Sequence, residues 1–434
     1  MSAPANLAVW HPFTQTHVDG EPLRIVRAEG TFLYTSDGRK IIDAIASWWV
    51  NLHGHCHPRI TAAIARQAKD LEHVLLAGFT HPSVERLTEM LQKVVPAELK
   101  HIFYSDNGST AVEVALKLAV QYWQNRGFSE KHEIVALEHA YHGDTVGAMS
   151  VSADSGFTSP FAGLRFPVHR VHSPYCLHCP VGKKRDTCNI DCIDSLKILL
   201  EKHGNRIAAV IVEPLLQGAG GMIVHPKEFL QRVRALCTEH DVLLVADEVL
   251  TGFGRCGTMF ACDQAGIAPE LLCLSKGITG GFLPLGATLC TEAIHSEFTG
   301  PNRSFFHGHS YTGNPLACAA AVANLEIFAT EDVFARIDFI TAQHRKYLAQ
   351  LASHPRVDET RQIGVVAAIE LKAVDSGYFS SLKPRLYKFF LERNVLLRPL
   401  GNIIYILPPY SISQADLARV YSVIEEALET VVAG

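Results

Sequence analysis

Short apolar runs alternate with longer amphipathic segments through the middle of the chain. Most runs are four to six residues long and almost wholly apolar, which is typical of strands buried on both faces. The predicted strands are 99–104, 133–137, 207–212, 242–246 and 271–274. Segments with helical spacing lie between them, as at 110–124 and 227–240. This alternation predicts an α/β fold in which helices cover a mostly parallel sheet.

The two ends of the chain have a different pattern. Near the N-terminus, residues 31–34 and 40–43 flank Ser36-Asp37-Gly38-Arg39, which is a hairpin signal, and a helix begins at Pro58. Beyond residue 330, helices alternate with short strands, which indicates a separate, smaller α+β domain. The helices are predicted at 333–351, 378–393 and 414–431, and the strands at 365–371 and 402–407. We therefore divide the chain into 1–57, 58–330 and 331–434.

Composition and charge exclude several classes of function. The formal net charge is -5 and the basic residues are scattered, which argues against a nucleic-acid partner. No uncharged apolar run approaches the roughly 20 residues needed to span a bilayer, and the N-terminus lacks the features of a secretory signal. The 11 cysteines, several of them in predicted strands and helices, fit reduced thiols better than a disulfide framework. We expect a cytoplasmic protein with no membrane partner.

Polar side chains follow four of the predicted strands, each at the point where the strand ends. They are Tyr141, Glu213, Asp247 and Lys276. Each alone could be a solvent-facing residue that marks a strand end. Because the carboxyl ends of parallel strands meet at one edge of a sheet, the four together predict a crevice that binds a ligand.

A fifth strand end predicts an anion site. The strand at 99–104 runs into Ser105-Asp106-Asn107-Gly108-Ser109, and a helix follows at once. The free backbone N–H groups and the dipole at a helix start attract an anion such as a phosphate. The alternative is that Ser109 only caps the helix.

A lysine, a strand-end carboxylate, an aromatic ring and an anion-binding helix start together suit pyridoxal phosphate. Lys276 would form the Schiff base, and Asp247 would keep the pyridine nitrogen protonated so that the ring can accept electrons. Tyr141 would stack on the ring, and Gly108 and Ser109 would hold the phosphate. The released amine of Lys276 would then move a proton.

Two tryptophans, Trp48 and Trp49, are adjacent in the sequence. They are open to two interpretations. One is a core tryptophan with a half-exposed neighbour, and the other is an aromatic wall of a pocket.

The segment VADEVLTGFGRCG, with LCLSKGITGG downstream, resembles the signature of the class III aminotransferases, which are fold type I pyridoxal phosphate enzymes. The resemblance covers nearly the whole chain. It implies a homodimer with two active sites at the subunit interface, a large cofactor domain, and a small domain built from both termini. It also implies that the chain is an aminotransferase whose cofactor is pyridoxal phosphate.

The resemblance assigns the cofactor-binding residues. Lys276 would carry the cofactor, Asp247 would pair with the pyridinium and Tyr141 would stack on the ring. The remaining contacts would come from Gly108 and Ser109 at the phosphate, Glu213 near a cofactor oxygen, and Ser310 of the partner subunit with His309 beside it.

Other motifs are similar to those of one branch of this family, which transfers an amino group to 8-amino-7-oxononanoate in biotin biosynthesis and forms 7,8-diaminononanoate. The motifs are Trp10-His11-Pro12-Phe13-Thr14, Ser47-Trp48-Trp49, Tyr141-His142-Gly143-Asp144-Thr145, His307-Gly308 and Arg398-Pro399-Leu400-Gly401. By this resemblance, the substrate-binding residues are Phe13, Trp48, Tyr141, Lys276, Gly308 and Arg398. A planar guanidinium such as that of Arg398 suits the substrate carboxylate, whereas its alternative role is a surface salt bridge.

Position 13 departs from the branch pattern, because many of these enzymes carry a tyrosine where this chain has Phe13. The change bears on the amino donor, for which we expect S-adenosylmethionine, with lysine as the alternative. A related ω-aminotransferase is a second alternative, and a non-catalytic cofactor-binding protein is a third. The retention of Lys276, Asp247 and Tyr141 argues against the last.

The insert 173–196 is the other departure. It carries four cysteines, Cys176, Cys179, Cys188 and Cys192, which could bind zinc as thiolates. Only the Cys-x2-Cys half has a spacing typical of zinc sites. We favour four reduced thiols in a surface loop and predict no metal site.

Overall fold

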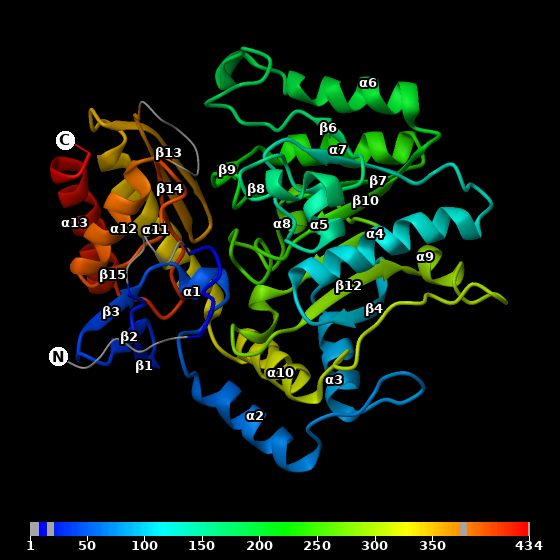
Figure 1. Ribbon diagram of the computed structural model, residues 1–434, viewed down its shortest axis with the longest axis horizontal. Coiled ribbons are helices and arrows are strands. Elements are labelled where there is room, and N and C mark those ends of the chain that lie inside the picture. The colour runs from blue at the N-terminus through cyan, green and yellow to red at the C-terminus, as the bar shows by residue number, and fades with distance from the viewer. Residues whose placement is uncertain (1–7, 15–20, 374–379, 433–434) are drawn as a thin grey trace.

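The computed structural model describes residues 8–14, 21–373 and 380–432. Its centre is a seven-stranded sheet with the order β4-β12-β11-β10-β7-β5-β6 (Figure 1). The strands are β4 (Leu99–Ser105), β5 (Glu133–Leu137), β6 (His169–Val171), β7 (Ile207–Val212), β10 (Leu243–Asp247), β11 (Leu271–Leu274) and β12 (Gly286–Thr291). Only β12 runs against its neighbours. The mostly parallel sheet is therefore confirmed, but strands β6 and β12 were not predicted from the sequence.

Both faces of this sheet are buried, which explains its continuous apolar strands. In β11, Leu271 and Cys273 pack on the α4 side, whereas Leu272 and Leu274 pack on the opposite side. The first side is covered by α4 (Gly108–Asn125), α5 (Val146–Val151) and α9 (Glu292–Ser296). The second side is covered by α6 (Asp194–His203), α7 (Lys227–Glu239) and α8 (Ala261–Ala265).

Three further helices lie beside the sheet, and two of them pack against the third, α10 (Pro315–Thr330). The two are α2 (Pro58–Asp70) and α3 (Pro82–Leu91). Helix α10 is buried on nearly all sides, as its run of small apolar residues requires. No helix within the described residues is long and apolar enough to cross a membrane.

The two ends of the chain pair with each other. Strands β1 (Ile25–Glu29), β2 (Phe32–Thr35) and β3 (Lys40–Asp43) form an antiparallel meander, and β3 pairs in parallel with β15 (Val395–Leu396). A second sheet contains β13 (Val357–Ile363), β14 (Val366–Leu371) and β16 (Ile403–Ile406). The helices around these sheets are α11 (Val333–Leu351), α12 (Leu382–Glu392) and α13 (Gln414–Thr430). The helix predicted at 378–393 begins at Leu382, and its first two residues lie outside the described residues. The domain boundaries at 57 and 330 remain predictions.

The remaining elements are short. Strands β8 (Leu216–Gln217) and β9 (Ile223–Val224) form a small ribbon, and the turn labelled α1 (Ala46–Trp49) follows β3. Short stretches of 3₁₀ helix lie at Ser159–Leu164, Arg185–Thr187, Asp191–Ile193 and Lys276–Thr279.

Candidate active site

A pocket of about 580 Å³ lies at the carboxyl ends of the parallel strands. The four strand-end residues predicted to converge all line it: Tyr141, Glu213, Asp247 and Lys276. The turn between β4 and α4 closes one side with residues 106–109. The sheet topology thus brings together side chains that are up to 170 positions apart in the sequence.

Lys276 lies directly beyond β11, at the first position of a 3₁₀ turn, with a φ of 36°. A non-glycine residue in this left-handed region is strained, and such strain gathers at functional sites. Its Nζ lies 5.0 Å from the centre of the Trp49 ring. Burial lowers the pKa of Lys276, against the smaller opposing effects of Asp247 and Glu213. The lowered pKa increases the share of the neutral amine, which is the nucleophilic form.

Asp247 is buried and fixed by two contacts. Its Oδ2 lies 2.7 Å from His142 Nδ1, and its Oδ1 accepts the N–H of Val249 at 3.1 Å. The first contact assigns a proton to Nδ1 of His142, because a carboxylate can only accept. His142 Nε2 is buried without a hydrogen-bond partner among the described residues. Sequence reasoning gave His142 no role of its own.

Glu213 supports the backbone on either side of the pocket. Its Oε1 accepts the N–H of Tyr141 at 3.0 Å, and its Oε2 accepts the N–H of Gly218 at 2.9 Å. Burial raises the pKa of Glu213 to about 7, with Asp247 adding to the shift and His142 opposing it. Burial also raises the pKa of the Tyr141 hydroxyl, which therefore keeps its proton at neutral pH.

The start of α4 forms an open cradle. Asn107, and not Ser109, is the cap, because Asn107 Oδ1 accepts the N–H of Thr110 at 3.0 Å. Ser109 Oγ instead accepts the N–H of Asp144 at 3.2 Å. A Cβ on Gly108 would lie 2.7 Å from Val249 Cγ1, so only glycine fits at this position. The helix start therefore faces the pocket without a covering side chain, as an anion site requires.

Both interpretations of the paired tryptophans hold. Trp49 is 4% exposed and Trp48 is 37% exposed, yet both line the pocket. Residues 46–49 form a left-handed turn with φ values between 45° and 76°. Asp43 stabilises this unfavourable turn, since its Oδ2 accepts Ser47 Oγ at 2.7 Å and lies 2.9 Å from His55 Nε2.

Two aromatic side chains and one arginine line the solvent-exposed side of the pocket. Phe13 lies edge to face with Trp48, with 5.3 Å between ring centres. The Arg398 guanidinium lies 4.9 Å from the Trp48 ring centre, and its Nη2 donates to the Phe13 carbonyl at 3.4 Å. No carboxylate among the described residues forms an ion pair with Arg398, so the surface salt bridge considered from the sequence is absent there.

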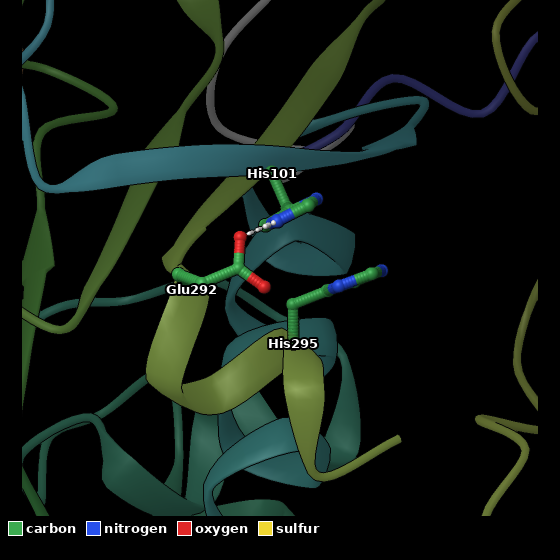
Figure 2. A group of neighbouring side chains, drawn as sticks. All are labelled: His101, Glu292 and His295. Carbon is green, nitrogen blue, oxygen red and sulfur yellow. Dashed lines mark hydrogen bonds and ion pairs between the residues drawn. The ribbon is translucent and has the colours of Figure 1, made fainter. Parts of the chain in front are cut away.

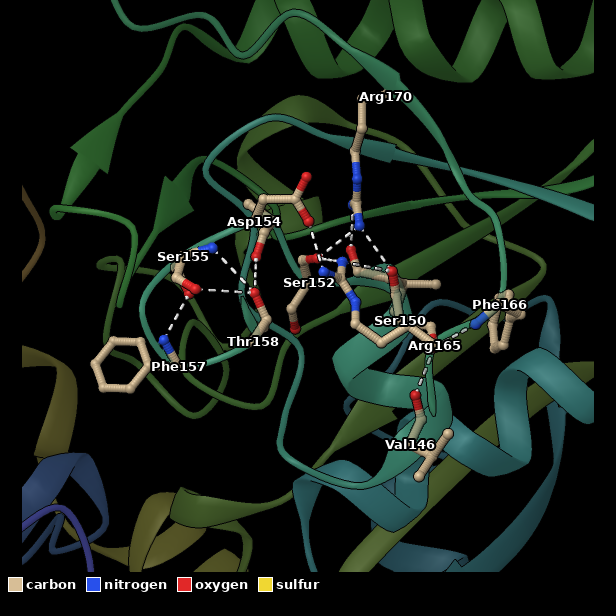
Figure 3. Close-up of polar contacts among 12 residues, drawn as sticks. Val146, Ser150, Ser152, Asp154, Ser155, Phe157, Thr158, Arg165, Phe166 and Arg170 are labelled. Atoms are coloured by element: carbon tan, nitrogen blue, oxygen red, sulfur yellow. Dashed lines mark hydrogen bonds and ion pairs between the residues drawn. The ribbon is translucent and has the colours of Figure 1, made fainter. Parts of the chain in front are cut away.

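Phe157 also lines the pocket, although the sequence did not single it out. Figure 3 shows how its loop is held. Thr158 Oγ1 accepts the N–H of Ser155 at 2.9 Å. Arg165 and Arg170 donate to the backbone carbonyls at the C-terminal end of α5, including that of Ser152. Two guanidinium groups at a helix C-terminus satisfy its free carbonyls and so fix the start of the loop.

The family model for class-III aminotransferases matches residues 14–428. The chain belongs to the class III aminotransferases. It is 46% identical over 430 residues to the adenosylmethionine-8-amino-7-oxononanoate aminotransferase of Synechococcus elongatus, which covers 99% of this chain and all of the relative. The solved enzyme of the same name from Methanocaldococcus jannaschii has a TM-score of 0.90 and 36% identity, covering 96% of this chain and 97% of the other. A PLP-bound amine transaminase from an uncultivated Pseudomonas species has a TM-score of 0.91 and 32% identity, with 98% of both chains covered.

Three predicted site residues of this class III aminotransferase do not reach its own pocket. Gly308, His309 and Ser310 lie in an exposed loop between α9 and α10 and do not line the cavity. His309 Nε2 lies 3.9 Å from Asp106 Oδ1, so the loop passes beside the turn that closes the pocket. Their roles in a partner subunit's site remain predictions.

The cysteine loop lies apart from this pocket. All 11 cysteines are free thiols, and seven of them are buried. In the insert, Cys179 Sγ accepts the N–H of Lys183 at 3.3 Å, and Cys188 Sγ accepts the N–H of Ile190 at 3.1 Å. The loop is tied to β14, because Tyr175 Oη donates to Glu370 at 2.7 Å.

Proposed function

We propose that this aminotransferase uses pyridoxal phosphate to transfer an amino group to 8-amino-7-oxononanoate, forming 7,8-diaminononanoate for biotin biosynthesis, with S-adenosylmethionine as the donor. The observation that carries the proposal is one pocket that combines Lys276, Asp247 and an open helix start with an outer arginine and tryptophan. The names of the similar relatives support the same substrates.

The residues present fit pyridoxal phosphate. The start of α4 offers backbone N–H groups to its phosphate, and Gly108 leaves room for it. The buried Asp247 carboxylate suits a protonated ring nitrogen, and Tyr141 offers an aromatic face. When bound, the cofactor acts as an electron sink for the carbon that carries the amino group.

The chain's own groups do the positioning and proton transfer. Lys276 Nζ would hold the cofactor covalently and, once displaced by the incoming amine, accept and return the proton at the substrate carbon. Its burial supports this role, because the lowered pKa leaves a neutral amine ready to accept. His142 would keep the Asp247 carboxylate in place, so that this carboxylate can pair with the protonated ring nitrogen.

The outer pocket supports a long substrate that ends in a carboxylate. Arg398 can bind that carboxylate with two hydrogen bonds, while Trp48, Phe13 and Phe157 cover an aliphatic chain. The aromatic faces of Phe13 and Trp48 also suit the sulfonium cation of S-adenosylmethionine through cation–π attraction. Phe13 retains this face although it lacks the tyrosine hydroxyl.

We further propose a cytoplasmic homodimer in which Gly308, His309 and Ser310 reach the partner subunit's pocket. Their exposure in the single chain and their position beside Asp106 support this arrangement. The free cysteines support a reducing compartment.

The first half-reaction tests the function directly. Protein loaded with pyridoxal phosphate is mixed separately with S-adenosylmethionine and with lysine, and the absorbance band of the lysine-bound cofactor is followed. Loss of the band with S-adenosylmethionine, followed by its return on addition of 8-amino-7-oxononanoate, is the expected result. Loss of the band with lysine but not with S-adenosylmethionine would show that lysine is the amino donor. No response to either in loaded protein would instead favour a broader ω-aminotransferase, and Lys276→Ala should show no band and no turnover.

A further inference from the structure

A cluster of three ligand-type side chains lies at the edge of the sheet opposite the pocket. His101 is near the start of β4, and Glu292 and His295 are on α9, which follows β12 (Figure 2). Because Glu292 and His295 are three positions apart on a helix, both point to the same side. The pairing of Cys290 with His101 brings that helix against β4.

The donor atoms of the three side chains all lie within 4.8 Å of one another. His101 Nε2 is 2.7 Å from Glu292 Oε2, and the two imidazole rings stack with 3.6 Å between their centres and 8° between their planes. Ligands on a tetrahedral zinc ion, each about 2.0–2.2 Å from the metal, lie about 3.4 Å apart. The cluster is therefore close to the size of a metal site.

We propose that His101, Glu292 and His295 bind a divalent transition-metal ion, of which Zn²⁺ fits best. Two imidazoles and one carboxylate form a three-ligand set that leaves a fourth position to water. Mg²⁺ and Ca²⁺ prefer all-oxygen sites and are excluded by the same set. The lone pairs of stacked rings do not converge, so binding requires one imidazole to rotate, which the broad χ2 range of histidine permits.

The cluster joins two separate elements, because His101 lies on β4 whereas Glu292 and His295 lie on α9. A bound ion would join β4 to α9 and so fix the start of the loop that carries Gly308 and Ser310.

Zinc binding to the cofactor-loaded protein tests the proposal. After treatment with a chelator and dialysis, wild type, His295→Gln and Glu292→Gln are titrated with ZnCl₂ by calorimetry, and bound zinc is counted by mass spectrometry. The matched control is His354→Gln, because His354 and Glu429 form a similar exposed pair, at 2.9 Å, with no third ligand among the described residues. MgCl₂ is the control ion.

Wild type and His354→Gln are expected to bind one more equivalent of Zn²⁺ per chain than the two cluster variants. Loss of one ligand should lower the Zn²⁺ affinity of this site at least about 100-fold. Loss of a residue that only hydrogen-bonds to a metal ligand typically lowers metal affinity by about 10- to 100-fold. Zn²⁺ should also raise the melting temperature of wild type and of His354→Gln only. Equal zinc content in all four proteins would overturn the proposal and leave the cluster as an ion pair beside a stacked ring. Because the readout is metal content, it does not depend on the proposed reaction.

Discussion

Phe13 and Phe157 meet edge to face, with 5.7 Å between their ring centres, and join the N-terminal segment to the loop after α5. Both rings line the pocket, and Phe13 is 45% exposed. The contact therefore closes part of the exposed side of the pocket with two residues 144 positions apart. Neither side chain has a polar atom, so the effect of the two rings on substrates must come from shape, apolar contact and their aromatic faces.

Phe157→Ala should weaken binding of the amino acceptor more than it slows the chemistry. An edge-to-face pair contributes about 0.5–1.5 kcal/mol, so the KM should rise about 2- to 12-fold with a smaller change in kcat. Phe166→Ala is the matched control, since Phe166 is in the same loop but does not line the pocket. Steady-state kinetics of both variants measure the changes in KM and kcat. An equal effect of the two substitutions would mean that the loop, and not the Phe157 ring, matters.

Phe13→Ala should slow the half-reaction with S-adenosylmethionine, because a cation loses an aromatic face. A cation–π contact worth about 0.5–2 kcal/mol corresponds to about a 2- to 30-fold rise in the concentration needed for half-maximal rate. Phe13→Tyr keeps the face and should remain close to wild type. A large gain from Phe13→Tyr would show instead that the missing hydroxyl limits the use of this donor.

His142→Ala should release the cofactor more easily, because Asp247 loses its charge-assisted partner. A hydrogen bond to a charged group contributes about 1.5–3 kcal/mol, so pyridoxal phosphate affinity should fall about 10- to 160-fold. The cofactor band, followed during dilution, gives this affinity without an activity assay. His142→Asn can still donate a hydrogen bond and should restore part of the loss. If the two variants behaved alike, His142 would act only by filling space.

Glu248 should make the protein less stable as the pH rises. This buried carboxyl accepts from Ala261, Cys262 and Thr251, yet burial raises its pKa to about 7. The pKa of Glu248 is higher in the folded state than in the unfolded state. Between about pH 4.5 and 7, the folded protein therefore keeps a proton on Glu248 that the unfolded chain has already released. The free energy of unfolding should therefore decrease across this range.

Urea unfolding at pH 5 and pH 8 measures this effect. In Glu248→Gln the decrease should be smaller than in wild type, whatever the absolute stability of the variant. Glu213 has a raised pKa of the same origin and would account for part of the decrease that remains. Identical slopes in the two proteins would refute the role of Glu248.

The sequence predicted most of the sheet and the residues at its edge, because buried strands and strand-end polar residues are local patterns. It predicted β5, β7 and β11 with the bounds that the structure has. It missed β12, whose residues 286–291 mix three apolar positions with one glycine and two threonines and so form no continuous apolar run. The helix cap at Asn107 was missed because both Asn107 and Ser109 are good capping residues, and only the backbone decides between them.

The residues missed at the site depend on contacts between distant segments. His142 is 105 positions from Asp247, and Phe157 acquires its position only when Arg165 and Arg170 hold the end of α5. His101 and Glu292, which are 191 positions apart, carry no local signal at all. Resemblance to a family supplied Arg398 and Phe13, which composition and periodicity would not have selected.

The pairing of β3 with β15 has a consequence for how the protein is made. Residues 40–43 leave the ribosome about 350 residues before their partner at 395–396, so this sheet cannot close until synthesis is nearly complete. Trp48 and Trp49, in the turn that follows β3, also contact this late segment, through Arg398 and Tyr405. The central sheet can assemble earlier from contiguous chain, whereas the aromatic wall must form last. A chain truncated before residue 395 would thus have the strands of its central sheet but an unfinished pocket.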